Sequence, residues 1–319
     1  MTHATMQTAS DLARRRNRML RDKLFVWLCL AVTLLSIIVL ATLLISILVQ
    51  GLQFLNLNFL TSYPSRFPDK AGFKGALWGS LWLCAICGLV ALPLGVGAAV
   101  YLEEFAPKNR VTTFIRLNIS NLAGVPSIVY GIIGLTAFGY MFWLFGSPTD
   151  PWREFGSPES FFYFRIPFGG CVLAGGLTLM IVILPIVIIA SQEALRAVPD
   201  SLREGALATG ATRWQMVQRM TLPAAMPGIM TGVILAMSRA IGEAAPLLVV
   251  GGFLFVTFTP QNLMDDFAAM PLQIYNWASR PQSDFHNVAA SGIIVLLAVL
   301  LSFNALAVFI RQKLQKPLQ

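Results

Sequence analysis

The sequence contains few charged residues and few of the side chains that enzymes use. Asp, Glu, Lys and Arg make up only 12% of its 319 residues, whereas 56% are hydrophobic, a composition typical of membrane proteins. The only histidines are His3 and His286, and no G-x-x-x-x-G-K-[ST], H-E-x-x-H or G-x-S-x-G pattern occurs. The chain therefore lacks a nucleotide-phosphate loop of its own, and we expect no catalytic residue, no metal ion and no cofactor.

Cysteine is also scarce, and its placement argues against redox or metal chemistry. Cys29, Cys84, Cys87 and Cys171 all lie within long apolar runs, where a thiol behaves as a small apolar side chain. The C-x-x-C spacing of Cys84 and Cys87 lacks the soluble context of a redox motif. We expect neither a disulfide nor a metal site.

Long uncharged runs recur along the chain. The run from Phe25 to Val49 is 25 residues long, and as a helix it rises about 37 Å, enough to cross a hydrocarbon core of about 30 Å. No A-x-A-like cleavage site follows it, so the Arg-rich start is interpreted as a retained anchor. The predicted spans are Phe25–Val49, Ala76–Tyr101, Leu122–Phe145, Phe168–Ser191, Pro227–Val256 and Val288–Ile310. The predicted fold class is an all-α integral membrane protein with six transmembrane helices.

Lys and Arg residues are distributed unequally between the two sides that these spans define. Fifteen fall on the side of the termini and of loop 192–223, and six fall in the opposite loops. The positive-inside rule therefore predicts a multi-pass plasma-membrane protein with both termini and this loop in the cytoplasm. The net charge of +8 flanks the spans, which favours contact with membrane lipid and argues against nucleic acid.

The same reading divides the chain into segments. We expect a basic, largely frayed cytoplasmic tail, a first transmembrane helix, an external loop, a transmembrane domain and a second cytoplasmic tail. Their bounds are 1–24, 25–49, 50–73, 74–310 and 311–319.

The stretch Ser201–Leu222, called the elbow below, is a polar island between hydrophobic runs. Ser201 with Glu204, and Thr212 with Gln215, have the spacing of capping boxes, which predicts two short helices. Gly210 lies between them, where a left-handed turn is cheap for a residue without Cβ, and Pro223 is expected to end the second helix. The pattern indicates a compact elbow suited to contact with another protein.

The fifth predicted span carries charges inside the membrane. Arg239 lies twelve residues beyond Pro227, roughly 18 Å along a helix, and Glu243 is its i+4 neighbour on the same face. Burying a guanidinium costs at least about 2.5–3.5 kcal/mol, so an intramembrane arginine indicates a functional site. Arg gives two parallel hydrogen bonds to an oxyanion, and Glu243 could accept one from the O–H of monohydrogen phosphate. A salt bridge that only stabilises the bundle is the alternative.

Other residues of the spans have weaker signals. Small residues at intervals of four, Gly228, Gly232, Ala236 and Ala240, predict close packing of a neighbouring helix, and Pro246 predicts a kink beside the charge pair. In the third span Ser127 and Tyr130 follow a proline, which suggests a pathway lining; local hydrogen bonding of these hydroxyls is the alternative.

Two sets of motifs resemble a known family. Glu204-Gly205-Ala206, three residues, Gly210, nine residues and Met220-Thr-Leu222-Pro223 resemble the EAA loop of ABC importer permeases, although Gly205 and Met220 stand where Ala and Ile are usual. The runs Leu122–Tyr130, Ala194–Trp214 and Arg239–Leu248 are similar to phosphate-specific ABC importer permeases. The segment Gly242–Leu248, with Pro271–Tyr275, is more similar to the A-type than to the C-type subunit of that family.

The resemblance implies a type I importer permease fold with a set of partners. These would be a C-type permease subunit in a heterodimer, a dimer of cytoplasmic ABC ATPases and an external phosphate-binding protein. Inorganic phosphate would be the substrate, moved by alternating access around Arg239. The ATPase-coupling residues implied are Glu204, Gly205, Ala206, Gly210, Leu222 and Pro223.

Other functions stay open at this point. The chain could be the C-type sister subunit, a permease for another oxyanion such as molybdate or sulfate, or a membrane scaffold that takes part in phosphate sensing without transport. A secondary transporter is disfavoured, because no internal repeat is visible.

Overall fold

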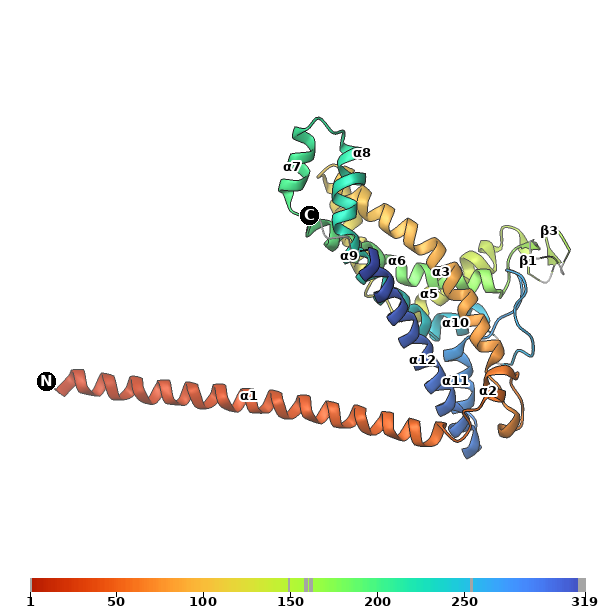
Figure 1. Ribbon diagram of the computed structural model, residues 1–319, viewed down its shortest axis with the longest axis horizontal. Coiled ribbons are helices and arrows are strands. Elements are labelled where there is room, and N and C mark those ends of the chain that lie inside the picture. Colours follow the sequence, from red (N-terminus) through yellow and green to blue (C-terminus); the bar gives the residue numbers. More distant parts are fainter. Residues whose placement is uncertain (1, 149, 158–159, 161–162, 253–254, 315–319) are drawn as a thin grey trace.

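The computed structural model describes residues 2–148, 150–157, 160, 163–252 and 255–314, and these are largely helical (Figure 1). The α-helices are α1 (Thr2–Gly51), α2 (Leu57–Thr61), α3 (Lys74–Val100), α4 (Arg110–Leu122), α5 (Ser127–Gly134), α6 (Val172–Arg196), α7 (Asp200–Ala208), α8 (Arg213–Met216), α9 (Leu222–Gly242), α10 (Ala245–Val250), α11 (Met270–Ala278) and α12 (Ser283–Leu314). The π turns η2 (Tyr101–Phe105), η3 (Leu135–Gly139) and η5 (Val217–Thr221) extend three of them, and η1 (Pro68–Lys70) and η4 (Met141–Trp143) are 3-10 turns. Two antiparallel hairpins pair β1 (Gly146–Ser147) with β2 (Asp150–Pro151) and β3 (Arg153–Phe155) with β4 (Phe164–Ile166).

Within the described residues, five helices are long and apolar enough to cross a membrane, and a bent pair makes a sixth span when it is counted as one. The pair consists of α4 and of α5 with η3, and the chain bends by 106° between them. The third span, predicted over Leu122–Phe145 with a kink residue at Pro126, is thus a broken one that begins at Arg110 and ends at Gly139. Pro126 disfavours helical geometry at the residue before it and has no N–H of its own, so the helix ends before Pro126 and restarts at Ser127.

The core is formed by α3, α6 and α9, with α6 the most buried of the spans. The predicted small-residue stripe of α9 faces α6, because a Cβ on Gly228 would lie 2.8 Å from the Cβ of Ala194 and one on Gly232 only 2.3 Å from that of Ala190. Only glycine allows the two backbones to approach this closely, so the predicted packing role of the stripe is confirmed.

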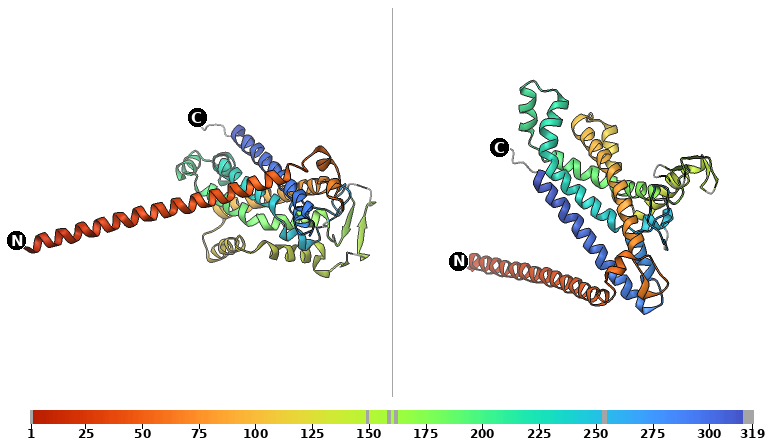
Figure 2. Two further views of the ribbon diagram at one scale, coloured as in Figure 1. Left: turned by 90° about the horizontal axis from the view of Figure 1, so that it is seen from below. Right: turned by 45° about the vertical axis from the view of Figure 1, so that its right-hand side comes forward.

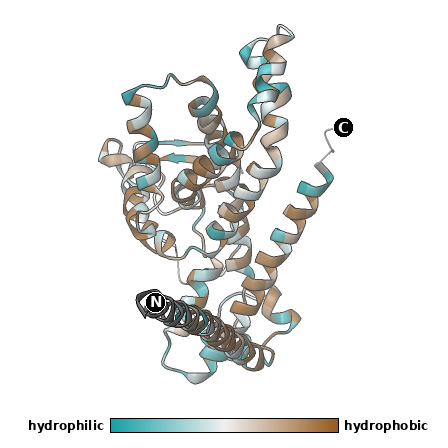
Figure 3. Ribbon diagram, turned by 90° about the vertical axis from the view of Figure 1, so that its left-hand side faces the viewer, coloured by the Kyte–Doolittle hydropathy of each residue, from teal (hydrophilic) through white to brown (hydrophobic). Residues whose placement is uncertain are grey.

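The first helix stands away from this core (Figures 1 and 2), and Figure 3, which looks almost along it, shows hydrophobic residues over much of its length. It is helical from Thr2 onward, so the frayed tail expected for residues 1–24 is wrong. Its join to the bundle is at its last residue, Gly51, whose carbonyl accepts a hydrogen bond of 2.7 Å from Ser291 on α12. The apolar side chains of α1 from Leu24 to Val49 are exposed, apart from the half-buried Ile47.

The fifth span differs from its prediction at both ends. It begins at Arg213, because α8, η5 and α9 form one continuous helix to Gly242 and Pro223 does not end it. The π turn shifts the hydrogen-bond register just before Pro223, which has no N–H to donate. The helix then stops at Gly242 rather than running on to Val256, and α10 restarts after Glu243 and Ala244, with Pro246 in its first turn.

Candidate functional site

The charge pair predicted in the fifth span is formed at this break. The Nε of Arg239 donates to Oε1 of Glu243 at 3.0 Å, as the i+4 spacing indicated. Glu243 itself has left the helix, with φ −77° and ψ 121°, so the pair links the last turn of α9 to the start of α10. The Arg239 side chain is 49% exposed, whereas that of Glu243 is 15% exposed.

Most of the Arg239 guanidinium is unused. Among the described residues neither of its Nη nitrogens has a hydrogen-bond partner, so both can bind oxygens of one ligand in a parallel pair. Glu243 beside it supplies acceptor oxygens. The arrangement suits a partly protonated oxyanion, which needs donors for its oxygens and an acceptor for its O–H.

The broken third span lies against the broken fifth span. A Cβ on Gly131 of α5 would lie 2.8 Å from the Cα of Pro246, so α5 and α10 are in close contact. Ser127, the first residue of α5, is partly exposed, but within the described chain it does not hydrogen-bond to Arg239 or Glu243. The Tyr130 side chain is buried, and its hydroxyl donates to the Leu122 carbonyl at 2.6 Å, which ties α5 to α4 across the bend. The local alternative stated for Tyr130 is therefore the one that its contacts support.

The elbow is a helical hairpin that projects from the bundle (Figures 1 and 2). Gly210 has φ +84° as predicted, and Thr212 and Gln215 form the expected capping box. The other predicted box is wrong: α7 starts one residue before Ser201, after Pro199, so Ser201 lies inside the first turn and caps nothing.

The ATPase-coupling residues that the family resemblance implies lie in three environments. Glu204, Gly205 and Gly210 are exposed on the hairpin, and Ala206 is buried with Met216 and Val217 in the small cluster that holds its two arms together. Leu222 and Pro223 lie in the first turn of α9 rather than on the hairpin. The exposed group therefore forms a surface that another protein can reach, and the rest supports it.

A cluster of charges built on two largely buried acids at the base of the elbow was not predicted. It consists of Glu103, Glu104, Arg116, Arg196 and Arg203, and is called the base cluster below. Glu103 accepts from Arg116 of α4 and, at 2.9 Å, from Arg196 of α6. Glu104 accepts from Arg203 of α7 at 3.0 Å. Because these two acids are adjacent in η2, the end of α3 is bound to α4, α6 and α7 together.

Arg203 is the most fully used member of the base cluster. Its Nη1 donates to the Val198 carbonyl and its Nη2 to that of Leu195, both at 2.7 Å, so it also satisfies carbonyls at and just beyond the end of α6. The side chains of Glu104 and Arg203 are only 6% and 19% exposed. The adjacent acids Glu103 and Glu104 at the end of a span were the one sign of this cluster in the sequence. Their arginine partners lie too far along the chain to be assigned from the sequence.

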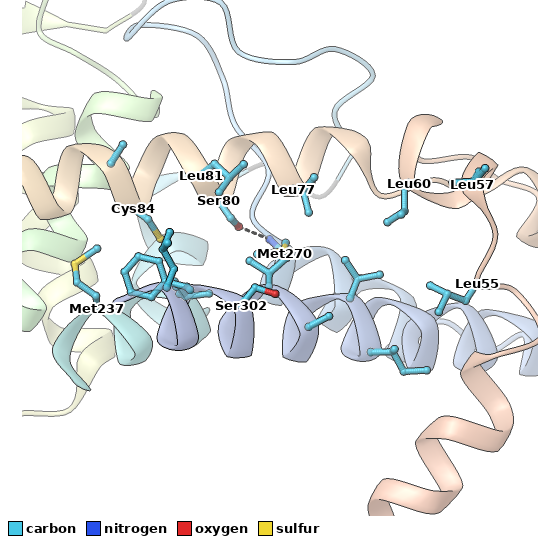
Figure 4. A pocket seen from close by; sticks show the side chains of 18 of the residues that line it. Leu55, Leu57, Leu60, Leu77, Ser80, Leu81, Cys84, Met237, Met270 and Ser302 are labelled. Atoms are coloured by element: carbon cyan, nitrogen blue, oxygen red, sulfur yellow. Dashed lines mark hydrogen bonds between the residues drawn. The ribbon is translucent and has the colours of Figure 1, made fainter. Parts of the chain in front are cut away.

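An apolar cavity of about 1030 Å³ lies between α3 and α12 (Figure 4). Its few polar groups include Ser80, whose hydroxyl oxygen already accepts the Met270 N–H at 2.8 Å, and Asn56, which caps α2. Because its lining contains no cationic side chain, it offers no site for an oxyanion.

Comparison with known proteins places most of the chain in one family. Residues 91–316 match the family described as "Binding-protein-dependent transport system inner membrane component". The probable ABC transporter permease protein YqgI of Bacillus subtilis is 31% identical over 85% of this chain and 88% of its own length. The phosphate transport system permease protein PstA of Xylella fastidiosa is 30% identical over 97% and 99%.

Solved structures agree on the fold. A bacterial ABC transporter involved in the import of the acidic polysaccharide alginate aligns with 94% of this chain and all of its own at 17% identity and a TM-score of 0.62. The inward-facing MetNI methionine ABC transporter aligns with 76% of this chain and 95% of its own at 15% identity and a TM-score of 0.57. The predicted all-α importer permease fold is confirmed.

Proposed function

The chain belongs to the family of binding-protein-dependent transport system inner membrane components, and we propose on that premise that it is the permease subunit of an ATP-driven importer of inorganic phosphate. The observation that carries the proposal is the Arg239–Glu243 pair at a helix break inside the span. The similarity to permeases named for phosphate transport supports the choice of substrate.

Binding of phosphate at this pair follows from the groups present. In the empty state Arg239 and Glu243 neutralise each other, which reduces the cost of holding either charge in the membrane. Arriving monohydrogen phosphate accepts two hydrogen bonds from the Nη groups of Arg239 and donates its O–H to Glu243. Sulfate carries no such proton at neutral pH, so Glu243 opposes it. Ser127 stays a proposed lining residue at the start of α5, whereas the buried Tyr130 is assigned the local role of tying α5 to α4.

The transport cycle requires partners that the chain does not contain. A dimer of cytoplasmic ABC ATPases hydrolyses ATP and holds the exposed elbow surface at Glu204, Gly205 and Gly210. A C-type permease subunit completes the pathway as a heterodimer, and an external phosphate-binding protein delivers the substrate. Both termini and the elbow lie in the cytoplasm of a bacterium, in keeping with the excess of Lys and Arg on that side.

ATPase closure then moves the elbow, and the base cluster passes the movement to the ends of α3 and α6 and to the middle of α4, which it binds. Since α4 leads into α5, and α5 packs on α10, the broken spans around Arg239 are mechanically connected to the elbow. This connection is the physical basis proposed for alternating access.

Uptake of labelled phosphate at low phosphate concentration tests the proposal. The gene for this chain is deleted from its host and restored on a plasmid. Uptake is then measured with and without excess sulfate or molybdate as competitor. Energy-dependent uptake that only this chain restores, and that competitors leave unchanged, is the expected result. Inhibition by a competitor would assign the other oxyanion, and uptake unaffected by deletion would indicate a sensing scaffold or redundancy with a sister subunit.

A further inference from the structure

A second cavity, of about 450 Å³, lies at the far end of α10 from Arg239. It is lined by the end of α10 at Val249, Val250 and Gly251, by Arg165 of β4 and by Asp266. Figure 1 places the hairpins that contribute to it on the opposite side of the molecule from α7 and α8. With the elbow in the cytoplasm, as proposed above, this cavity faces the outside.

Arg165 is fixed in position but not neutralised. Its Nε donates to the Phe168 carbonyl at 3.1 Å. No carboxylate of the described residues is within ion-pair distance of its guanidinium, although Glu154 is its cross-strand neighbour in the hairpin. Tyr163 hydrogen-bonds to that glutamate. The Nη groups of Arg165 are therefore held beside the cavity without a carboxylate partner among the described residues.

The turn beside Arg165 leaves its guanidinium room on that side. Gly169 has φ +72°, and a Cβ there would lie 3.1 Å from Nη2 of Arg165 and 3.3 Å from the Cβ of Pro148. Any other residue would both strain the backbone and press on the guanidinium. The same distances place Pro148 at the edge of the cavity, next to the positive charge.

Asp266 supplies the acceptor on the same cavity. Burial raises the pKa of its carboxyl, Arg165 opposes that shift, and Asp265 adds to it. Asp265 is occupied elsewhere, because its Oδ2 accepts the N–H groups of Gln261 and Asn262 at 2.7 and 3.1 Å. Asp266 and Arg165 thus combine an acidic and a basic group, as Glu243 and Arg239 do, but without a direct ion pair.

We propose that this cavity is an outer receiving site for monohydrogen phosphate, in which Arg165 donates to two phosphate oxygens and Asp266 accepts from the O–H. The inference rests on the proposed function and adds a second binding site to it. The six residues of α10 rise about 9 Å, so a released anion meets Arg165 first and Arg239 one short helix later. Arg165 and Asp266, which form no direct ion pair, receive the anion, and the ion-paired Arg239 and Glu243 at the helix break bind it next.

Thiol labelling in the intact importer complex tests binding directly. In Pro148→Cys, a membrane-impermeant sulfonate-bearing thiosulfonate reagent is expected to react from outside, and saturating inorganic phosphate to slow the reaction at least about threefold. Arg165→Gln on this background should abolish the protection. Equal labelling with and without phosphate, or protection that survives Arg165→Gln, would overturn the inference. Tyr140→Cys on the same cavity serves as reporter if the first variant does not insert.

Measurement of phosphate uptake by the complex distinguishes an Arg165 that binds phosphate from one that only stabilises the hairpin. Arg165→Gln is expected to lower the uptake rate at saturating phosphate at least about tenfold, since it removes charge-assisted hydrogen bonds. Arg153→Gln is the matched control, because Arg153 lies on the paired strand, against the Trp152 ring at 4.8 Å, and does not line the cavity. It should leave uptake unchanged, and an equal loss in both variants would assign Arg165 to hairpin stability alone.

The affinity of the complex for the phosphate-free binding protein gives the final discrimination. It should be the same in wild type and Arg165→Gln, because the proposed ligand is the anion. A weakening of severalfold would mean that Arg165 binds a carboxylate of that protein, and the inference would fall. If wild type takes up no phosphate at all, the proposed function fails instead, so the two failures are distinguishable.

Discussion

The base cluster and the Arg239–Glu243 pair use the same residue types in opposite ways. Arg203 contacts Glu104, Asp200 and two backbone carbonyls, and Glu104 is 6% exposed. Arg239 is 49% exposed and uses one nitrogen for one contact among the described residues. An arginine whose donors are all engaged can only hold structure, whereas one with idle donors at a helix break can bind and release a ligand.

The largest expected effect comes from removing the idle donors. Arg239→Gln should lower uptake at least about a hundredfold, because two charge-assisted hydrogen bonds contribute about 1.5–3 kcal/mol each. The complex should still assemble, which co-purification of the ATPase measures. Arg239→Lys keeps the charge but loses the two parallel N–H donors of the guanidinium, so its uptake rate should lie between those of wild type and Arg239→Gln. Loss of assembly in Arg239→Gln would indicate a structural salt bridge instead.

Breaking the saturated pair should act on stability rather than on binding. Glu104→Gln leaves the largely buried Arg203 with only the exposed Asp200 as counter-charge, so the cost should approach the about 3–5 kcal/mol of breaking a buried pair. The matched control is Asp200→Asn, which removes an 86% exposed carboxylate from the same arginine and should cost less than about 1 kcal/mol. Thermal unfolding of the purified complex measures both. Equal shifts in the midpoint would contradict the assigned role.

The elbow can be tested with two glycines of one motif. Gly210→Val places a β-branched residue at φ +84°, which costs about 1–2 kcal/mol and distorts the exposed turn; a Cβ there meets no atom within 4 Å. The variant should insert normally, yet ATP hydrolysis should no longer drive uptake. Gly205→Ala adds a methyl group in open space inside α7, so it should stabilise the helix by about 0.5–1 kcal/mol and keep coupling. Normal coupling in Gly210→Val would remove the elbow from the mechanism.

Features set by neighbouring residues could be predicted from the sequence, and features set by packing could not. Gly210 and the Thr212 capping box depend on local backbone chemistry, and the i+4 spacing was enough to pair Arg239 with Glu243. The break after Gly242 adjoins the contact of Pro246 with Gly131 on another span. The Glu104–Arg203 pair joins residues 99 apart. Pro223 was misjudged because proline alone predicts a stop, whereas a π turn shifts the register before it.

The smallest expected effect tests whether the Tyr130 hydroxyl has a structural role or contacts the transported anion. Tyr130→Phe removes the hydrogen bond to the Leu122 carbonyl and little else, so it should cost about 0.5–1.5 kcal/mol. If Tyr130 only ties α5 to α4, thermal unfolding shifts slightly and the uptake rate at saturating phosphate stays near wild type. If the hydroxyl also contacts the anion, uptake falls while the midpoint barely moves. Ser127→Ala is the companion variant, because Ser127 is partly exposed at the start of the same helix and lacks that structural bond. A loss of uptake in Ser127→Ala without one in Tyr130→Phe would place the pathway on the exposed side of α5.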